Sequence, residues 1–114
     1  MAKKKILVVD DSDTSLMMGL LVLKRAAYDV IIARDGAEGI EKAAAEKPDL
    51  ILMDAVMPRV DGFSAAHELR RRDDTRGIPV VMLTSRSAAD AGDCLTKPLE
   101  PEALLAKVRG YLGS

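Results

Sequence analysis

Tryptophan is absent from this chain, and phenylalanine and tyrosine together make up only 3% of it. The chain therefore has few of the aromatic side chains on which single-stranded nucleic acids usually stack. A single cysteine, Cys94, excludes an internal disulfide and is typical of a reducing compartment. No apolar run approaches the roughly 18 residues of a membrane-spanning helix, and a net charge of −1 creates no overall attraction to nucleic acid or anionic lipid. We expect a cytoplasmic protein that binds neither nucleic acid nor membranes.

The residues that are present have the balance of a globular domain. Hydrophobic residues make up 48% of the chain and charged residues 31%, which is unlike the composition of disordered proteins. A length of 114 residues corresponds to one domain with a core of its own. We therefore expect residues 1–114 to form a single domain with no output domain attached.

Short apolar runs alternate with helical patterns along the whole chain. Strands are predicted at 6–9, 30–33, 50–54, 78–85 and 94–96, and helices from Ser12 or Asp13 onward, from the Asp35 cap to Lys47, over 63–72 and over 100–112. This alternation predicts an α/β fold, in which a parallel sheet carries helices on both faces.

Two of these helices have apolar residues at helical spacing. The first helix has Leu16, Met17, Leu20 and Leu21 with Lys24, and the last has Leu104, Leu105, Val108 and Leu112. The second set is expected to share one face of an amphipathic helix.

Five chemically active residues fall at the carboxyl ends of predicted strands, namely Asp10, Asp11, Asp54, Thr84 and Lys97. In open α/β sheets, ligands bind outside these strand ends, so the five side chains are expected to converge on one pocket. Carboxylates about 4 Å apart repel one another by roughly 4 kcal/mol per pair at an effective dielectric of 20. A hard cation such as Mg²⁺, which prefers oxygen ligands, offsets that repulsion.

This set of residues suits the transfer of a phosphoryl group to a carboxylate. Asp54, between the acid pair and Lys97, is the natural nucleophile. The metal and Lys97 neutralise phosphoryl oxygens, Thr84 offers a hydroxyl, and backbone N–H groups after Asp54 and Thr84 bind the remaining oxygens.

The segments "VVDDS", "LILMDAVMPRVDG", "VVMLTS" and "LTKP", in this order, resemble the receiver domain of two-component response regulators. The resemblance covers nearly the whole chain, and it implies a flavodoxin-like, doubly wound sheet of five parallel strands in the order 2-1-3-4-5. It also implies a histidine kinase or a histidine phosphotransfer protein as phosphodonor and a downstream protein target. Catalysis would be limited to self-phosphorylation and self-dephosphorylation, so the protein is not expected to be an enzyme in the usual sense.

The resemblance also implies specific roles in the site. Asp54 would be the phosphoacceptor, Thr84 the switch hydroxyl and Lys97 the lysine that senses the phosphate. Mg²⁺, or alternatively Mn²⁺, would be bound by Asp10, Asp11, Asp54 and the backbone carbonyl of Val56. Family members often have a cis peptide bond at the position of Lys97–Pro98.

The sequence departs from the family pattern between Thr84 and Cys94. Only nine residues, 85–93, lie there, whereas a parallel crossover normally needs about a dozen or more. We predict that the family's fourth helix is missing or vestigial, and that its loss exposes apolar groups of 80–83. The exposed face would be covered by a partner or by a second copy of the chain. Alternatively, neighbouring side chains and a rearranged loop cover the gap.

Other residues have ordinary interpretations. Cys94 replaces the aromatic residue usual in receivers and is interpreted as a small buried hydrophobe, so the readout of phosphorylation would be rerouted, for example through the first helix. His67 is interpreted as an exposed helix residue, and Asp13 as a helix cap. Arg70–Arg72, followed by two aspartates, is typical of a solvated helix end.

Two alternatives to a phosphorylated receiver remain. A degenerate receiver would act as an interaction module independent of phosphorylation, as the short 85–93 segment suggests. A haloacid-dehalogenase-type phosphohydrolase is the enzyme alternative. Its nucleophile and second acid lie two residues apart on the first strand, which the adjacent Asp10 and Asp11 do not match.

Overall fold

The computed structural model describes residues 3–57, 61–85 and 93–113. Its centre is a five-stranded sheet in the order β2-β1-β3-β4-β5, and every pair of neighbouring strands is parallel. The strands are β1 (Lys5–Val9), β2 (Asp29–Ala33), β3 (Leu50–Asp54), β4 (Val80–Thr84) and β5 (Cys94–Thr96), and the helices are α1 (Asp13–Arg25), α2 (Gly36–Glu46), α3 (Gly62–Arg71) and α4 (Pro101–Leu112). The predicted α/β fold and strand order are confirmed.

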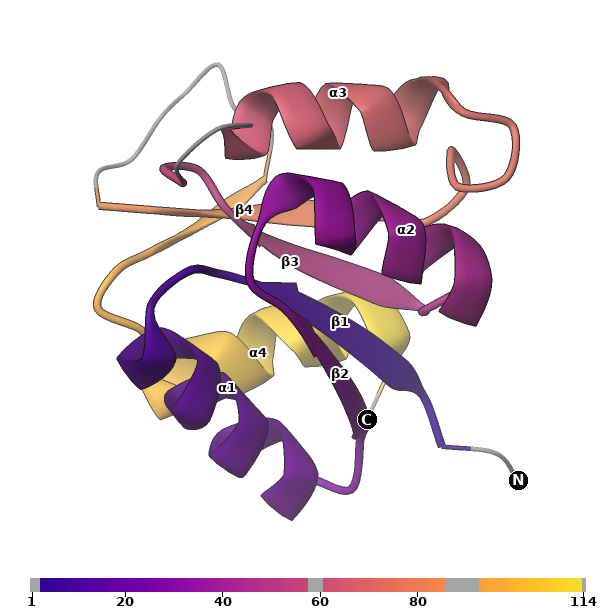
Figure 1. Cartoon of the computed structure of the whole chain (residues 1–114). Coiled ribbons are helices and arrows are strands. Elements are labelled where there is room, and N and C mark those ends of the chain that lie inside the picture. Colours follow the sequence, from indigo (N-terminus) through magenta and orange to yellow (C-terminus); the bar gives the residue numbers. More distant parts are fainter. Residues whose placement is uncertain (1–2, 58–60, 86–92, 114) are drawn as a thin grey trace.

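The helices form two layers around the sheet (Figure 1). α2 and α3 cover one face, and α1 and α4 cover the other. Side chains of β1 alternate between the two layers: Leu7 and Val9 join the core under α2 and α3, whereas Ile6 and Val8 join the core under α1 and α4. Because both faces are covered, β1 is a continuous apolar run rather than an alternating one.

Three helices begin at a polar cap. The Ser12 hydroxyl accepts from the Ser15 N–H at α1, the Asp35 carboxylate caps α2, and the Asp61 carboxylate caps α3. Such caps satisfy N–H groups that have no partner within the helix. The predicted caps at Ser12 and Asp35 are confirmed, and Asp13 lies in the first turn of α1 instead of capping it.

The apolar residues of α1 do not all face the core. Leu16, Gly19 and Leu23 are buried, whereas Met17 and Leu21 are 64% and 56% exposed. Apolar residues surround most of this helix, so their spacing did not define a single face. α4 packs as predicted, and in the described part of the chain no helix is both long and apolar enough to cross a bilayer.

The predicted exposure of β4 is also wrong. Residues 80–83 are at most 6% exposed. Val80 and Met82 belong to the same core cluster as Leu69 of α3, so neighbouring side chains cover this strand, as the alternative interpretation held. The prediction of a missing or vestigial fourth helix concerns the segment 85–93, and 86–92 lie outside the described residues. The helix α4 is the one predicted over 100–112.

Candidate functional site

The candidate site lies at the carboxyl ends of the parallel strands. Asp10 follows β1, Asp54 ends β3, Thr84 ends β4 and Lys97 follows β5. Because the strands are parallel, their carboxyl ends share one edge.

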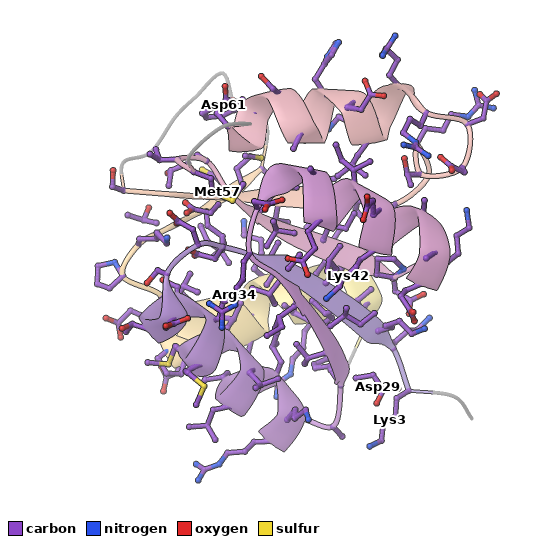
Figure 2. The ribbon with its side chains drawn as sticks, in the orientation of Figure 1. Lys3, Asp29, Arg34, Lys42, Met57 and Asp61 are labelled. Atoms are coloured by element: carbon purple, nitrogen blue, oxygen red, sulfur yellow. The ribbon has the colours of Figure 1, made fainter. Side chains whose placement is uncertain are left out.

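The two ends of the molecule can be told apart in Figure 2. Met57 and Asp61, which follow β3, lie at the end opposite to Lys3, which precedes β1, and Asp29, which begins β2. The polar residues of the site are therefore gathered at one end.

Three acids meet there, as predicted. Asp10 is fully buried, Asp54 is 4% exposed and Asp11 is exposed. One carboxylate oxygen of each lies within 4.8 Å of the others. Such closeness of like charges is unfavourable unless a cation lies nearby.

Lys97 supplies one positive charge to this cluster. Its Nζ lies 2.8 Å from Asp10 Oδ2 and 3.3 Å from Asp54 Oδ1. Burial disfavours the charged ammonium, but the hydrogen bond and charge of Asp10 and the charge of Asp54 outweigh it and raise the pKa of Lys97. The lysine is therefore held in its charged form between two acids.

The charge of Lys97 does not compensate Asp54 fully. Burial, followed by the negative charge of Asp10, raises the pKa of Asp54 to about 6, although Lys97 and the Val56 N–H act in the opposite direction. The site therefore carries more negative charge than its own cation neutralises. A perturbed carboxylate in such a cluster is typical of a functional position.

Asp10 has an oxygen that is suited to a metal ion. Its Oδ1 accepts from the Ser12 N–H at 2.9 Å. Its Oδ2 is buried and lies 2.8 Å from the Lys97 ammonium group. Three carboxylates this close together form a hard oxygen donor set that fits Mg²⁺.

Val56 and Thr84 complete the predicted residues. The Val56 N–H donates to Asp54 Oδ1 at 3.3 Å, and the role of the Val56 carbonyl as a metal ligand stays a prediction. Thr84 is 6% exposed, and its carbonyl accepts from the Lys97 N–H at 2.6 Å. The Lys97–Pro98 bond is cis, as the resemblance implies.

Gly62 is a site residue that sequence reasoning missed. Its N–H donates to the Ala55 carbonyl at 3.0 Å, and a Cβ at this position would lie 1.8 Å from the Asp54 carbonyl oxygen. The first turn of α3 therefore packs directly against the backbone of Asp54, which requires glycine. An Asp-Gly pair shortly after the strand that ends in Asp54 was the available signal.

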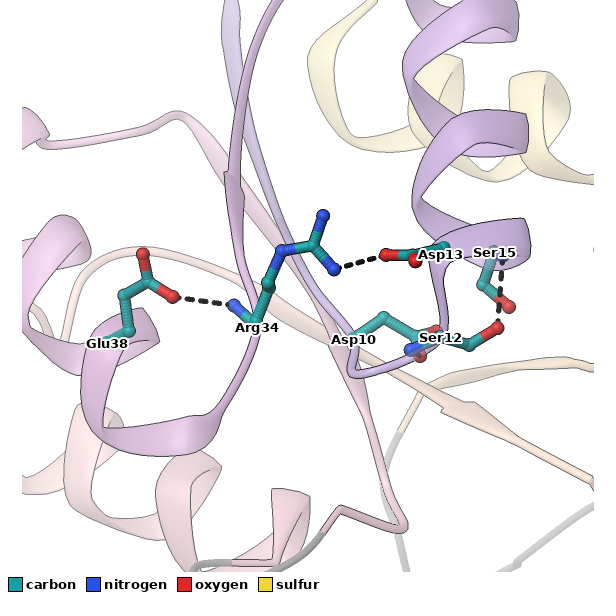
Figure 3. Close-up of polar contacts among 6 residues, drawn as sticks. All are labelled: Asp10, Ser12, Asp13, Ser15, Arg34 and Glu38. Carbon is teal, nitrogen blue, oxygen red and sulfur yellow. Dashed lines mark hydrogen bonds and ion pairs between the residues drawn. The ribbon is translucent and has the colours of Figure 1, made fainter.

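A second group of polar contacts borders Asp10 (Figure 3). The Arg34 guanidinium, just after β2, pairs with Asp13 of α1, and the Arg34 N–H donates to Glu38 at 2.8 Å. The Arg34 N–H, followed by Lys42, lowers the pKa of Glu38. These contacts connect the end of β2 to the first turns of α1 and α2.

The ordinary interpretations of two other features are supported, and that of a third holds in part. His67 is exposed on α3. Arg71 pairs with Glu68 at 2.6 Å and Arg72 with Asp74 at 2.9 Å, as expected for a solvated helix end. Cys94 packs against the core beneath α2 and α3, as predicted, but it is half-buried and not buried.

Comparison with known proteins gives a consistent result. The family model described as "Response regulator receiver domain" matches residues 6–109. Protein PilH of Pseudomonas aeruginosa is 36% identical, with 95% of this chain and 97% of that protein covered. The alkaline phosphatase synthesis transcriptional regulatory protein PhoP of Bacillus subtilis is 38% identical over 96% of this chain, which spans only 48% of PhoP.

Two solved structures are similar in fold. Chemotaxis protein CheY4 of Vibrio cholerae has a TM-score of 0.89 and 32% identity, with 96% of this chain and 99% of that chain covered. The receiver domain of sensor histidine kinase PA1611 from P. aeruginosa, solved with magnesium coordinated in its active-site cleft, has a TM-score of 0.90 and 30% identity, with 99% and 100% covered. The chain belongs to the response regulator receiver domain family.

Proposed function

We propose that the chain accepts a phosphoryl group on Asp54 in a Mg²⁺-dependent reaction and signals, in the cytoplasm, through contacts with other proteins. The observation that carries this proposal is the convergence of three carboxylates and Lys97 within one small site. The magnesium in the PA1611 receiver domain supports the choice of metal.

The residues of the site have distinct roles in the proposed reaction. A carboxylate oxygen of Asp54 attacks phosphorus, and the bond from phosphorus to the donor's histidine nitrogen breaks, so that nitrogen keeps the electron pair. The Lys97 ammonium and the Val56 N–H, which already contact Asp54, are positioned to stabilise charge on the phosphoryl oxygens. Thr84, at the end of β4, would bind the product acyl phosphate through its hydroxyl.

The metal would be held by Asp10, Asp11, Asp54 and the Val56 carbonyl, and Mn²⁺ is an alternative occupant. When bound, the ion supplies positive charge that reduces repulsion between the acids and the incoming phosphoryl group. The donor would be a histidine kinase or a histidine phosphotransfer protein. Because the protein itself is modified, we expect no turnover of an external substrate beyond slow loss of its own phosphate.

The test is transfer from acetyl phosphate with Mg²⁺, read by intact mass. Wild type gains one phosphoryl group, Asp54→Asn gains none, and Asp61→Asn, which removes a nearby exposed charge but keeps the helix cap, is labelled like wild type. Labelling of Asp54→Asn would mean that another residue is the nucleophile.

The same experiment, together with beryllofluoride binding, distinguishes the proposed function from that of a degenerate receiver. If wild type takes no phosphoryl group and beryllofluoride with Mg²⁺ causes no NMR shift near Asp54, the chain acts as an interaction module independent of phosphorylation.

A further inference from the structure

β5 is the shortest strand in the described part of the sheet. It is a three-residue strand at the edge of the sheet and pairs only with β4 among the described strands. Only its central residue, Leu95, is buried. Strand register is normally fixed by a set of side chains that must face the core, so one such side chain specifies it weakly.

Asp93, immediately before β5, makes three contacts that compensate for this shortness. Its carbonyl accepts from the Met82 N–H of β4 at 2.9 Å. Its Oδ1 accepts from Lys107 Nζ at 2.7 Å, and its Oδ2 accepts from the Tyr111 hydroxyl at 2.6 Å. One residue therefore connects the start of β5 to both β4 and α4.

The helix that donates the two side-chain hydrogen bonds, α4, is anchored in the core. Lys107 and Tyr111 lie one turn apart on α4, so both reach the same carboxylate. Leu104 and Val108, on the core side of the same turns, are fully buried. β5 and α4 also line an open cavity of about 900 Å³, and Asp93, Lys107 and Tyr111 border that cavity.

The other end of β5 leads directly into the site. The Lys97 N–H donates to the Thr84 carbonyl, and the Lys97 ammonium contacts Asp10 and Asp54. A slip of one residue moves a strand by about 3.3 Å and turns each side chain to the opposite face. Such a slip would remove the ammonium group from both acids, whose contacts with it are 2.8 and 3.3 Å long.

We propose that Asp93 is a positioning residue that holds β5 in register through α4 and thereby places the Lys97 ammonium group in the site. The inference deepens the proposed phosphoryl transfer and depends on it for its functional consequence. The hydrogen bonds from Lys107 and Tyr111 lower the pKa of Asp93, so the carboxylate that makes these contacts is stabilised in its charged form.

The test compares Asp93→Ala with wild type and with Asp74→Ala, which breaks another surface ion pair, to Arg72, away from the site. Misplacement of a catalytic group by about 1 Å can slow a reaction by roughly 100-fold. We expect Asp93→Ala to be phosphorylated by acetyl phosphate about 10- to 100-fold more slowly. Its Mg²⁺ affinity should be retained or increased, because the metal-binding acids follow β1 and end β3 and the displaced ammonium group no longer competes with the ion for Asp10 and Asp54. Asp74→Ala should match wild type in both measurements.

A second measurement does not depend on phosphorylation. In metal-free protein, the Nζ NMR signal of Lys97, assigned with Lys97→Arg, should move in Asp93→Ala and stay in place in Asp74→Ala. Asp93→Asn, which keeps a carbonyl to accept from Tyr111, should recover part of the phosphorylation rate.

The outcomes separate the two proposals. If wild type takes no phosphoryl group, the proposed function fails, and the Nζ signal still tests the position of Lys97. An unchanged rate together with an unchanged Nζ signal in Asp93→Ala would overturn the role of Asp93. If Asp93→Ala does not fold, Tyr111→Phe removes one of the two side-chain contacts and is judged by the same criteria.

Discussion

Replacing the proposed phosphoacceptor should make the metal-free protein more stable. Asp54 is 4% exposed, and its burial, with the charge of Asp10, raises its pKa from 3.8 to about 6. A carboxyl group with a raised pKa destabilises the folded state wherever it is ionised. The cost is absent below pH 3.8, develops between pH 3.8 and about 6, and is complete at neutral pH.

The size of this cost follows from the shift. One pKa unit corresponds to about 1.4 kcal/mol, so a rise from 3.8 to about 6 corresponds to at most about 3 kcal/mol at pH 7. The shift already includes the favourable charge of Lys97, which keeps its contact with Asp10 when Asp54 is neutralised. We therefore expect Asp54→Asn to raise the free energy of unfolding by about 1–3 kcal/mol.

Urea unfolding with a chelator at pH 7 and at pH 4 measures this effect. Asp54→Asn should be more stable than wild type at pH 7, and the difference should shrink at pH 4, where the wild-type carboxyl group is largely protonated. Asp29→Asn, an exposed acid at the start of β2, serves as control and should change stability by less than about 0.5 kcal/mol. An Asp54→Asn protein that is no more stable than wild type at pH 7 would refute the argument from buried charge.

Three further predictions concern the same regions. Gly62→Ala should destabilise the protein by about 1–3 kcal/mol or more through overpacking, whereas Gly110→Ala, with no atom near its Cβ, should stabilise α4 by about 0.5–1 kcal/mol in urea unfolding. Mg²⁺ at about 100 times its dissociation constant should add about 2.7 kcal/mol of stability in thermal unfolding, and Asp10→Asn should abolish this gain. The hydrogen bond to Asp93 raises the pKa of Tyr111 to about 12, so the bond is lost as pH rises through that value. Tyrosinate absorbance, measured with the other tyrosine replaced, should show a Tyr111 pKa closer to 10 in Asp93→Ala.

The sheet and the ends of its strands could be predicted because they depend on local patterns. Continuous apolar runs indicated strands with both faces covered, and a polar residue at the end of each run indicated the shared edge. Asp10, Asp54 and Lys97 do meet there, at distances that support the prediction.

The remaining features depend on long-range packing that these patterns do not report. Met17 and Leu21 are exposed because α1 is apolar around most of its circumference, and only contact with the sheet decides which side is buried. The contacts of Asp93 with Lys107 and Tyr111 join residues 14 and 18 positions apart, and no motif marked them. The four-residue spacing of Lys107 and Tyr111 on one helix was the available hint.

Because β5 is an edge strand, the part of the site that it carries is expected to be locally less stable than the parts carried by β1 and β3. β1 and β3 pair with a strand on each side, whereas the three residues of β5 pair on one side. Local opening of a weakly held edge costs less than global unfolding. Amide hydrogen exchange should therefore be faster at Leu95 and Lys97 than at Val8 and Leu52. Local opening of β5 would separate Lys97 from the acids of the site transiently, while the acids keep their positions.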